Sequence, residues 1–218
     1  MSTTTKKPFV LGLDLDGVVG DYTAAFRPVV AQIKGQSIES MPDPIDFALW
    51  NCPGWNIKDK ADYTELHRIA LNEFHIYRDM PVYEGAIEHI NQLVEMGVRI
   101  KIVTTRLFTK GDYHKVLTDT SIWLEKNNIP FDEICFVRDK PAVGAHLYVD
   151  DAPHNITEIQ AELGHDRVII YDQPWNQGIE GVRAAADENG GRIFTQWDHL
   201  VGMIPAMGMM AGYELAKR

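Results

Sequence analysis

Two aspartates stand at the end of an apolar segment close to the N-terminus. Residues 10–13 are apolar, and Asp14, Leu15, Asp16 and Gly17 follow them. An uninterrupted apolar run is typical of a strand that is buried on both faces, and the two-residue period of a strand directs Asp14 and Asp16 to the same side. Two carboxylates held this close repel each other unless a positive charge lies between them. The pattern therefore predicts a hard divalent cation, Mg²⁺ rather than zinc, at the end of this strand.

Three further segments carry polar side chains at or near the end of an apolar run. Thr104 and Thr105 end one run, Asp150 and Asp151 end another, and Lys140 lies in the connection ahead of the second run. In an open parallel α/β sheet, ligands bind beyond the carboxyl ends of the strands. We therefore expect carboxylates, hydroxyls and one ammonium group to meet at one edge of a sheet.

This set of groups suits phosphoryl transfer through an aspartyl-phosphate. One carboxylate attacks phosphorus, while a second protonates the leaving oxygen and later activates water. A metal ion and a lysine neutralise charge on the phosphoryl oxygens, and a hydroxyl orients them. Each motif alone also has a structural explanation, because Asp-Gly pairs are common in turns and Asp150-Asp151 would cap a helix that begins at Pro153. Their common position at strand ends favours catalysis.

Strands and helices alternate along most of the chain, which is typical of an α/β fold with a parallel, doubly wound sheet of Rossmann-like type. Besides the first strand, the pattern predicts strands at 98–103, 133–137, 146–149 and 167–171 and helices at 21–35, 85–96, 112–127 and 153–164. The segment 36–78 interrupts this alternation with an irregular, proline-rich stretch and then a helix, opened by a capping box at Asp62 and Glu65 and continuing to Tyr77. We predict a core domain of residues 1–35 and 79–218 with a small helical cap, residues 36–78, inserted after the first strand.

The order of these motifs resembles that of the haloacid-dehalogenase superfamily of phosphatases. The resemblance rests on Asp14 and Asp16, on Thr104, on Lys140 and on the pair at 150–151. It implies that Asp14 is the nucleophile, that Asp16 is the general acid/base, and that Thr104 and Lys140 contact the phosphoryl group. It also implies Mg²⁺ held by Asp14, by the backbone carbonyl of Asp16 and by Asp150. We interpret Asp151 as the residue that orients this metal site.

A closer resemblance is to the 5′(3′)-deoxyribonucleotidases, which dephosphorylate nucleoside monophosphates. It rests on Thr104-Thr105, on the segments 138–140 and 147–153, and on a helical cap between the first two motifs. In this chain Arg106 stands where the family pattern has a proline. Arg106 is interpreted either as a ligand of the substrate phosphate or sugar, together with Thr105, or as the partner of an acidic residue at the surface.

The cap contains the aromatic residues that would distinguish one phosphate ester from another. Trp50, in an irregular stretch, is a candidate wall for stacking on a nucleobase, and Phe47 and Tyr77 are further candidates for substrate contact. Phe26, which precedes the predicted cap, is another candidate. The helical spacing of Tyr77 also suits a residue of the cap core. Three functions remain open on this basis: a nucleoside-monophosphate phosphatase, a phosphatase of another small metabolite such as a sugar phosphate, and a non-catalytic binding module with the same fold.

Composition excludes several other classes of function. The chain has 218 residues and a net charge of −10, which argues against binding to polymeric nucleic acid. Its two cysteines form no disulfide framework, and no segment is apolar over a membrane-spanning length, so we expect a cytoplasmic protein that binds no membrane. The methionine-rich tail after Ile204 is interpreted as a docking or homodimer segment or as a plain surface tail.

Overall fold

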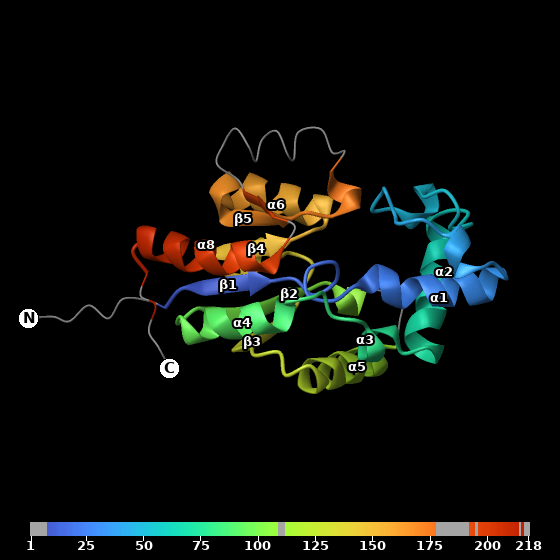
Figure 1. Cartoon of the computed structure of the whole chain (residues 1–218), viewed down its shortest axis with the longest axis horizontal. Helices are drawn as coiled ribbons and strands as arrows, with labels where there is room; N and C mark the ends of the chain where they lie inside the picture. Colours follow the sequence, from blue (N-terminus) through green and yellow to red (C-terminus); the bar gives the residue numbers. More distant parts are fainter. Residues whose placement is uncertain (1–7, 109–111, 178–191, 195, 214, 216–218) are drawn as a thin grey trace, which may run out of the picture.

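A parallel sheet of six strands forms the centre of this computed structural model (Figure 1). The strand order is β3-β2-β1-β4-β5-β6, and every neighbouring pair is parallel. The order reverses between β1 and β4, where doubly wound folds bind their ligands. The strands are β1 (Val10–Leu13), β2 (Arg99–Thr104), β3 (Glu133–Phe136), β4 (Leu147–Asp150), β5 (Val168–Tyr171) and β6 (Arg192–Phe194). The structure describes residues 8–108, 112–177, 192–194, 196–213 and 215.

Helices cover both faces of the sheet, which confirms the predicted doubly wound α/β fold. Alternate residues of a strand point to opposite faces. Leu11 and Leu13 belong to a cluster on one face, whereas Tyr148 and Ile170 belong to a cluster on the other. The first face is covered by α4 (Ala86–Glu95), α5 (Tyr113–Lys126) and α8 (Trp197–Met210), and the second by α6 (Pro153–Leu163). The short strand β6 is the element of this sheet that the sequence analysis does not predict.

The cap lies beyond the carboxyl ends of the strands, as the direction of the β1 arrow shows (Figure 1). It contains α1 (Tyr22–Lys34), α2 (Lys60–Glu73), α3 (Ile76–Asp79) and two short 3-10 turns, η1 (Ile38–Ser40) and η2 (Leu49–Asn51). Phe26 and Val30 of α1 are buried in one cluster with Trp55 and Leu66. Because α1 packs with the cap residues, we propose that the cap begins at α1 rather than at residue 36.

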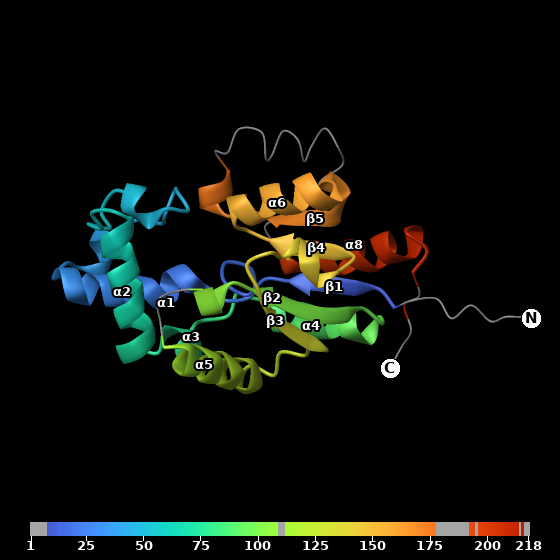
Figure 2. The same cartoon turned by 180° about the vertical axis from the view of Figure 1, so that it is seen from behind.

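The helix of the cap differs from its prediction at both ends. Its N-cap is Asp59, whose side chain accepts hydrogen bonds from the backbone N–H groups of Ala61 and Asp62. The predicted capping box at Asp62 and Glu65 is therefore wrong, because the earlier aspartate already satisfies the orphan N–H groups of the first turn. The helix also stops short of Tyr77: His75 adopts a left-handed conformation (φ 52°) that separates α2 from α3 (Figure 2).

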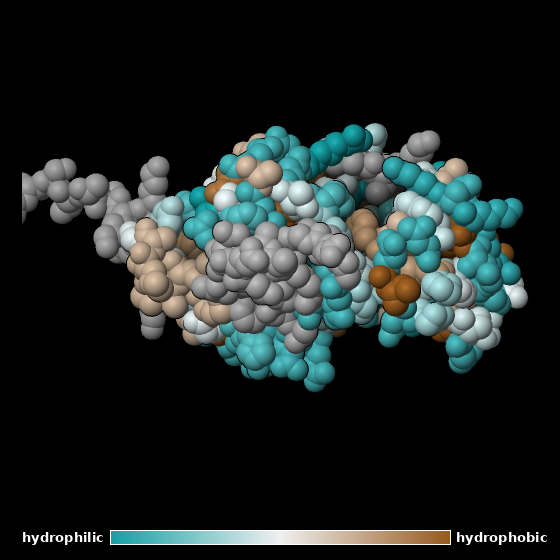
Figure 3. All heavy atoms as spheres, turned by 90° about the horizontal axis from the view of Figure 1, so that it is seen from above, coloured by the Kyte–Doolittle hydropathy of each residue, from teal (hydrophilic) through white to brown (hydrophobic). Residues whose placement is uncertain are grey.

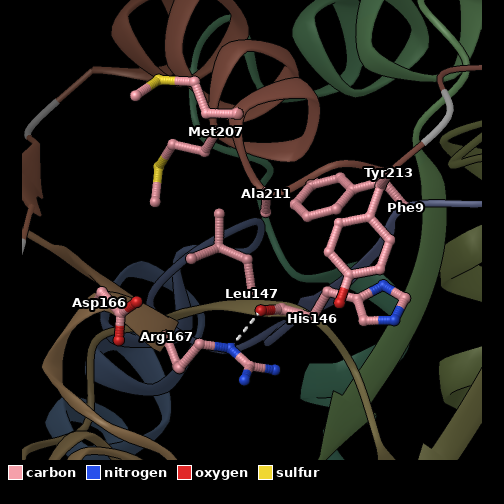
Figure 4. Close-up of a pocket in the computed structure, with 9 residues that line it drawn as sticks. Phe9, His146, Leu147, Asp166, Arg167, Met207, Ala211 and Tyr213 are labelled. Atoms are coloured by element: carbon pink, nitrogen blue, oxygen red, sulfur yellow. Dashed lines mark hydrogen bonds between the residues drawn. The ribbon is translucent and has the colours of Figure 1, made fainter.

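The segment after Ile204 belongs to the fold and is not a plain surface tail. It forms the second half of α8, where Ile204 is fully buried in the cluster beneath the sheet. Met209 and Met210 remain exposed, and this end of the molecule is pale brown in the space-filling view (Figure 3). Tyr213 lies against His146 beside a cavity of about 420 Å³ (Figure 4). This cavity is at the amino ends of the strands, whereas the predicted catalytic residues Asp14 and Asp150 are at the carboxyl ends.

Candidate active site at the carboxyl ends of the strands

Three acidic side chains meet at the switch point between β1 and β4. Asp14 follows β1, Asp150 is the last residue of β4, and Asp151 comes next. Each offers a carboxylate oxygen, and these oxygens lie within 4.8 Å of one another. All three residues are buried. Parallel strands end at the same edge of a sheet, so two apolar strands are enough to bring these carboxylates together.

Lys140 links two of these acids. Its Nζ lies 3.0 Å from Asp14 Oδ1 and donates a hydrogen bond of 2.6 Å to Asp150 Oδ2. The residue is fully buried at the start of η4 (Pro141–Val143), the turn that leads into β4. Burial opposes its charge, but Asp14 and Asp150 outweigh burial and raise the pKa of Lys140 above its usual range. The ammonium group is therefore charged and lies against the carboxylates of Asp14 and Asp150.

Asp14, Asp150 and Asp151 together carry more negative charge than Lys140 alone neutralises. Burial, together with the charges of Asp150 and Asp16, raises the pKa of Asp14 to about 7 despite Lys140. Burial and the charges of Asp14 and Asp150 raise the pKa of Asp151 well above its usual range. A divalent cation among these oxygens would remove the repulsion, and a set of carboxylate donors suits a hard ion. The residues at this edge therefore fit a divalent metal ion.

The side chain of Asp16 turns toward Arg106. The guanidinium donates through Nε to both carboxylate oxygens, at 3.2 and 3.0 Å, and through Nη2 to Oδ1 at 2.7 Å. Arg106 begins η3 (Arg106–Phe108), the turn after β2, and its side chain is completely buried. Of the two interpretations of Arg106, the structure shows the second: the guanidinium pairs with an acidic residue. The assumption that this acid is a surface residue is wrong, because the partner is the predicted general acid/base.

Thr104 and Thr105 lie at the carboxyl end of β2. Thr104 is the last residue of β2 and is buried, and its Oγ1 accepts a hydrogen bond of 3.3 Å from the backbone N–H of Arg106. Thr105 follows it and is partly exposed. Both lie on the same edge of the sheet as Asp14, as their strand-end positions predict.

A fifth strand end contributes residues that the sequence analysis missed. After β5, the turn η6 (Pro174–Asn176) places Trp175, whose Nε1 donates to Asp151 Oδ2 at 2.8 Å. Gln173 donates to the backbone oxygen of Gly17 at 2.6 Å. Asn155 of α6 donates to both oxygens of Asp150, at 3.1 and 3.3 Å. The polar run directly after the fifth strand was the available signal, because it obeys the same strand-end rule as the other motifs.

Gly17 allows the chain to turn after Asp16 and to pass close to Asp151. Its φ of +80° lies in the region that only glycine adopts without strain. A Cβ atom on Gly17 would also overlap the carboxylate of Asp151. The turn after Asp16 therefore requires glycine both for its conformation and for its close approach to the metal-ligand candidate.

The four aromatic candidates of the cap separate into two pairs. Phe26 and Tyr77 are buried, at 0% and 3% exposure, inside the cap cluster. The prediction that Phe26 contacts substrate is corrected, because a completely buried ring offers no surface to a ligand. Trp50 is partly buried with its ring 5.7 Å from that of Tyr63. Phe47 is 47% exposed and contacts His154, three residues beyond Asp151, so it bridges the cap and the core near the site.

The parallel sheet and its covering helices have the fold of haloacid-dehalogenase-like proteins. The fold resembles that of a haloacid dehalogenase-like hydrolase from Streptococcus pneumoniae, with a TM-score of 0.56 at 13% identity over 93% of this chain and 99% of the other. It also resembles that of a putative phosphoglycolate phosphatase from Lactobacillus delbrueckii subsp. bulgaricus, with a TM-score of 0.55 at 13% identity over 92% and 99% of the two chains.

A sequence profile narrows this class. The family described as "5' nucleotidase, deoxy (Pyrimidine), cytosolic type C protein" matches residues 8–192, and the chain belongs to this family. It is 31% identical over 185 residues to a putative 5'(3')-deoxyribonucleotidase of Chlorobaculum tepidum, covering 85% of this chain and 89% of the relative. A protein of the same description in Bordetella bronchiseptica is 28% identical over 76% of this chain and 84% of its own. The chain is thus a phosphoric monoester hydrolase for a small phosphate ester. Among the described residues, no helix has the length and apolar character required to cross a membrane.

Proposed function

We propose that this chain is a Mg²⁺-dependent nucleotidase that hydrolyses nucleoside monophosphates, with a preference for deoxyribonucleotides, through an aspartyl-phosphate on Asp14. The main support is the position of Asp14: it lies at the switch point within 4.8 Å of two further carboxylates and 3.0 Å from Lys140 Nζ. A buried carboxylate beside an ammonium group suits attack on an anionic phosphoryl group, because the ammonium offsets the repulsion between the two anions. The deoxyribonucleotide preference is supported by the descriptions of the relatives.

The reaction proceeds in two steps in this proposal. A carboxylate oxygen of Asp14 forms a bond to phosphorus while the phosphorus–oxygen ester bond breaks, and the leaving oxygen takes a proton from Asp16. Water then attacks the phosphorus and gives its proton to Asp16, and the bond between phosphorus and Asp14 breaks to release phosphate. Asp16 is suited to both proton transfers because its side chain is one quarter exposed at the edge that Asp14 occupies.

Asp14, Asp150 and Asp151 would hold the Mg²⁺, the first two by direct contact in the arrangement that the superfamily implies. Bound there, the ion supplies positive charge to the phosphoryl oxygens. Lys140 supplies a second positive charge and keeps Asp14 and Asp150 in place. Trp175 and Asn155 orient Asp151 and Asp150 by hydrogen bonds.

The test is a panel of substrates assayed with and without Mg²⁺. The panel contains purine and pyrimidine nucleoside 5′- and 3′-monophosphates in ribo and deoxy forms, several sugar phosphates and p-nitrophenyl phosphate. We expect the highest kcat/KM for a deoxyribonucleotide, complete loss of activity with a chelator and recovery with Mg²⁺. A higher kcat/KM for a sugar phosphate than for any nucleotide would reject the nucleotidase proposal and favour a general phosphatase.

The nucleophile is tested by Asp14→Asn. An amide is a poor nucleophile and a weaker metal ligand, so we expect turnover to fall by at least about 10³-fold. Beryllium fluoride, which mimics a phosphoryl group on aspartate, should inhibit the wild type and bind the variant far more weakly. Near-normal turnover of the variant, with deamidation excluded by mass spectrometry, would remove Asp14 from this role. We also propose a cytoplasmic location, which agrees with the cytosolic type of the family and with two free cysteines.

A further inference from the structure

Arg106 lies in the candidate active site, but its side chain is too deeply buried for a substrate to contact it. Its side chain has 0% exposure, whereas the Asp16 carboxylate it contacts is 25% exposed. A guanidinium has five N–H donors, and four of them already face Asp16, Thr120 Oγ1 and the sulfur of Met80. A residue that bound the substrate phosphate directly would keep donors directed at the open side of the site.

The surroundings of Arg106 hold it in one position. Its Cζ lies over the rings of Tyr77 and Trp123, 4.2 and 5.1 Å from their centres. Trp123 is fixed in turn by a hydrogen bond of 2.7 Å from its Nε1 to the backbone oxygen of Met80. Tyr77 belongs to the cap, whereas Trp123 and Thr120 belong to α5 of the core. The guanidinium is therefore held between a cap residue and core residues, and its Nε and Nη2 groups donate to Asp16.

We propose that Arg106 is a positioning residue that holds the carboxylate of Asp16 in the orientation required for proton transfer to the leaving oxygen and from water. The proposal rests on the proposed function, in which Asp16 is the general acid/base. A bidentate pair restricts both oxygens of the carboxylate, which a single ammonium contact does not do. The guanidinium also stabilises the anion that remains on Asp16 after it has donated its proton to the leaving oxygen.

This role differs from substrate binding in a measurable way. An alkoxide leaving group, such as the sugar oxygen of a nucleotide, requires protonation, whereas p-nitrophenolate leaves without it. The second step needs Asp16 with either substrate, because water must be activated each time. Loss of Asp16 positioning should therefore slow both steps for a nucleotide but only the second step for p-nitrophenyl phosphate.

The experiment compares Arg106→Lys and Arg106→Met with the wild type by rapid-quench and steady-state kinetics. For a nucleoside monophosphate we expect kcat to fall about 10- to 100-fold with less than a threefold change in KM, since general acid/base catalysis contributes about 10²–10⁴-fold. For p-nitrophenyl phosphate we expect a burst of nitrophenolate at nearly the wild-type rate, followed by slow turnover. Arg106→Lys should retain more activity than Arg106→Met, because it keeps the positive charge and loses only the bidentate pairing with Asp16.

A matched control is Arg78→Met. Arg78 also pairs with an aspartate, Asp79 of α3, but its side chain is 40% exposed, and we expect wild-type kinetics. A rise in KM with unchanged kcat in the Arg106 variants would overturn the proposal and assign Arg106 to substrate binding. Equal slowing of the burst and of turnover would also overturn it. If Arg106→Met does not fold, the Arg106→Lys measurements decide. Failure of the wild type to form a phosphoenzyme would instead reject the proposed function itself.

Discussion

The strand-end rim and the cap interior bury polar groups in opposite ways. We use "rim" for Asp14, Asp16, Arg106, Lys140 and the pair at 150–151, where charges are buried against opposite charges. The cap interior instead buries uncharged polar groups, namely tyrosine hydroxyls and an imidazole. Tyr22 and Tyr63 share a hydrogen bond of 3.1 Å between their hydroxyls, and burial lowers the pKa of His67 to about 4, so that this imidazole is neutral.

The difference teaches which residues a sequence identifies. A buried charge is costly without a partner, so acidic side chains at several strand ends indicate that a buried basic group or a cation lies near them. An aromatic ring is equally suited to a core and to a ligand-binding wall, because both environments are apolar on one side. Phe26 and Phe47 have the same chemistry, yet one is completely buried and the other is 47% exposed. Only the tertiary structure separates them.

The largest effect is expected at Asp16, the proposed general acid/base of the rim. We expect Asp16→Asn to lower kcat by about 10²–10⁴-fold, because an amide transfers no proton. Metal binding should survive, since the proposed contact uses the backbone carbonyl of residue 16. The measurements are steady-state kinetics and the rise in Tm that Mg²⁺ produces. Loss of that rise together with turnover would show that the Asp16 side chain is itself a metal ligand.

Trp175→Phe tests whether the residues around the rim matter through the metal. The variant keeps a ring but removes the N–H group that donates to Asp151. We expect the Mg²⁺ concentration for half-maximal activity to rise about 10- to 100-fold, as is typical when a hydrogen bond that orients a metal site is lost. Saturating Mg²⁺ should restore most of kcat. A lower kcat with an unchanged Mg²⁺ requirement would contradict this role.

Trp50→Ala tests whether the cap recognises the base. Stacking of a nucleobase on an aromatic ring contributes about 1–3 kcal/mol, which corresponds to roughly tenfold or more in affinity. We expect KM to rise by about that factor for a nucleoside monophosphate and to remain nearly unchanged for p-nitrophenyl phosphate. Equal increases for both substrates would make Trp50 a structural residue. Phe47→Ala, at the exposed contact with His154, is the companion variant for the same comparison.

The neutral imidazole in the cap predicts an effect on stability. The pKa of His67 is about 4 in the folded chain, against about 6.5 in an unfolded chain, mainly because of burial. Below pH 6.5 the unfolded chain therefore binds a proton that the folded chain does not. Stability contributed by this group is complete above pH 6.5 and is lost as the pH falls toward 4.

At pH 5 the expected loss is about 2 kcal/mol relative to pH 7. The measurement is urea unfolding of the wild type and of His67→Gln at both pH values. We expect the variant to lose less stability on acidification than the wild type. An identical pH dependence in the two proteins would mean that His67 is already solvated or charged in the fold.

The amino-acid sequence by itself determined the architecture and most of the rim. Apolar runs separated by amphipathic helices predict a parallel sheet, and parallel strands bring Asp14, Thr104 and Asp150 to one edge whatever the details of packing. Lys140 was also predicted, from its distance to Asp150 along the chain, in the connection between β3 and β4. These features depend on local pattern and on the direction of the strands.

The tertiary structure alone decided the partners and the exposure of individual side chains. The pairing of Arg106 with Asp16 joins residues 90 positions apart, and Trp175 reaches Asp151 across 24 positions. The burial of Phe26 depends on how α1 meets the rest of the cap. No local period encodes such contacts, because they arise when separate elements dock and exclude water from the surfaces between them.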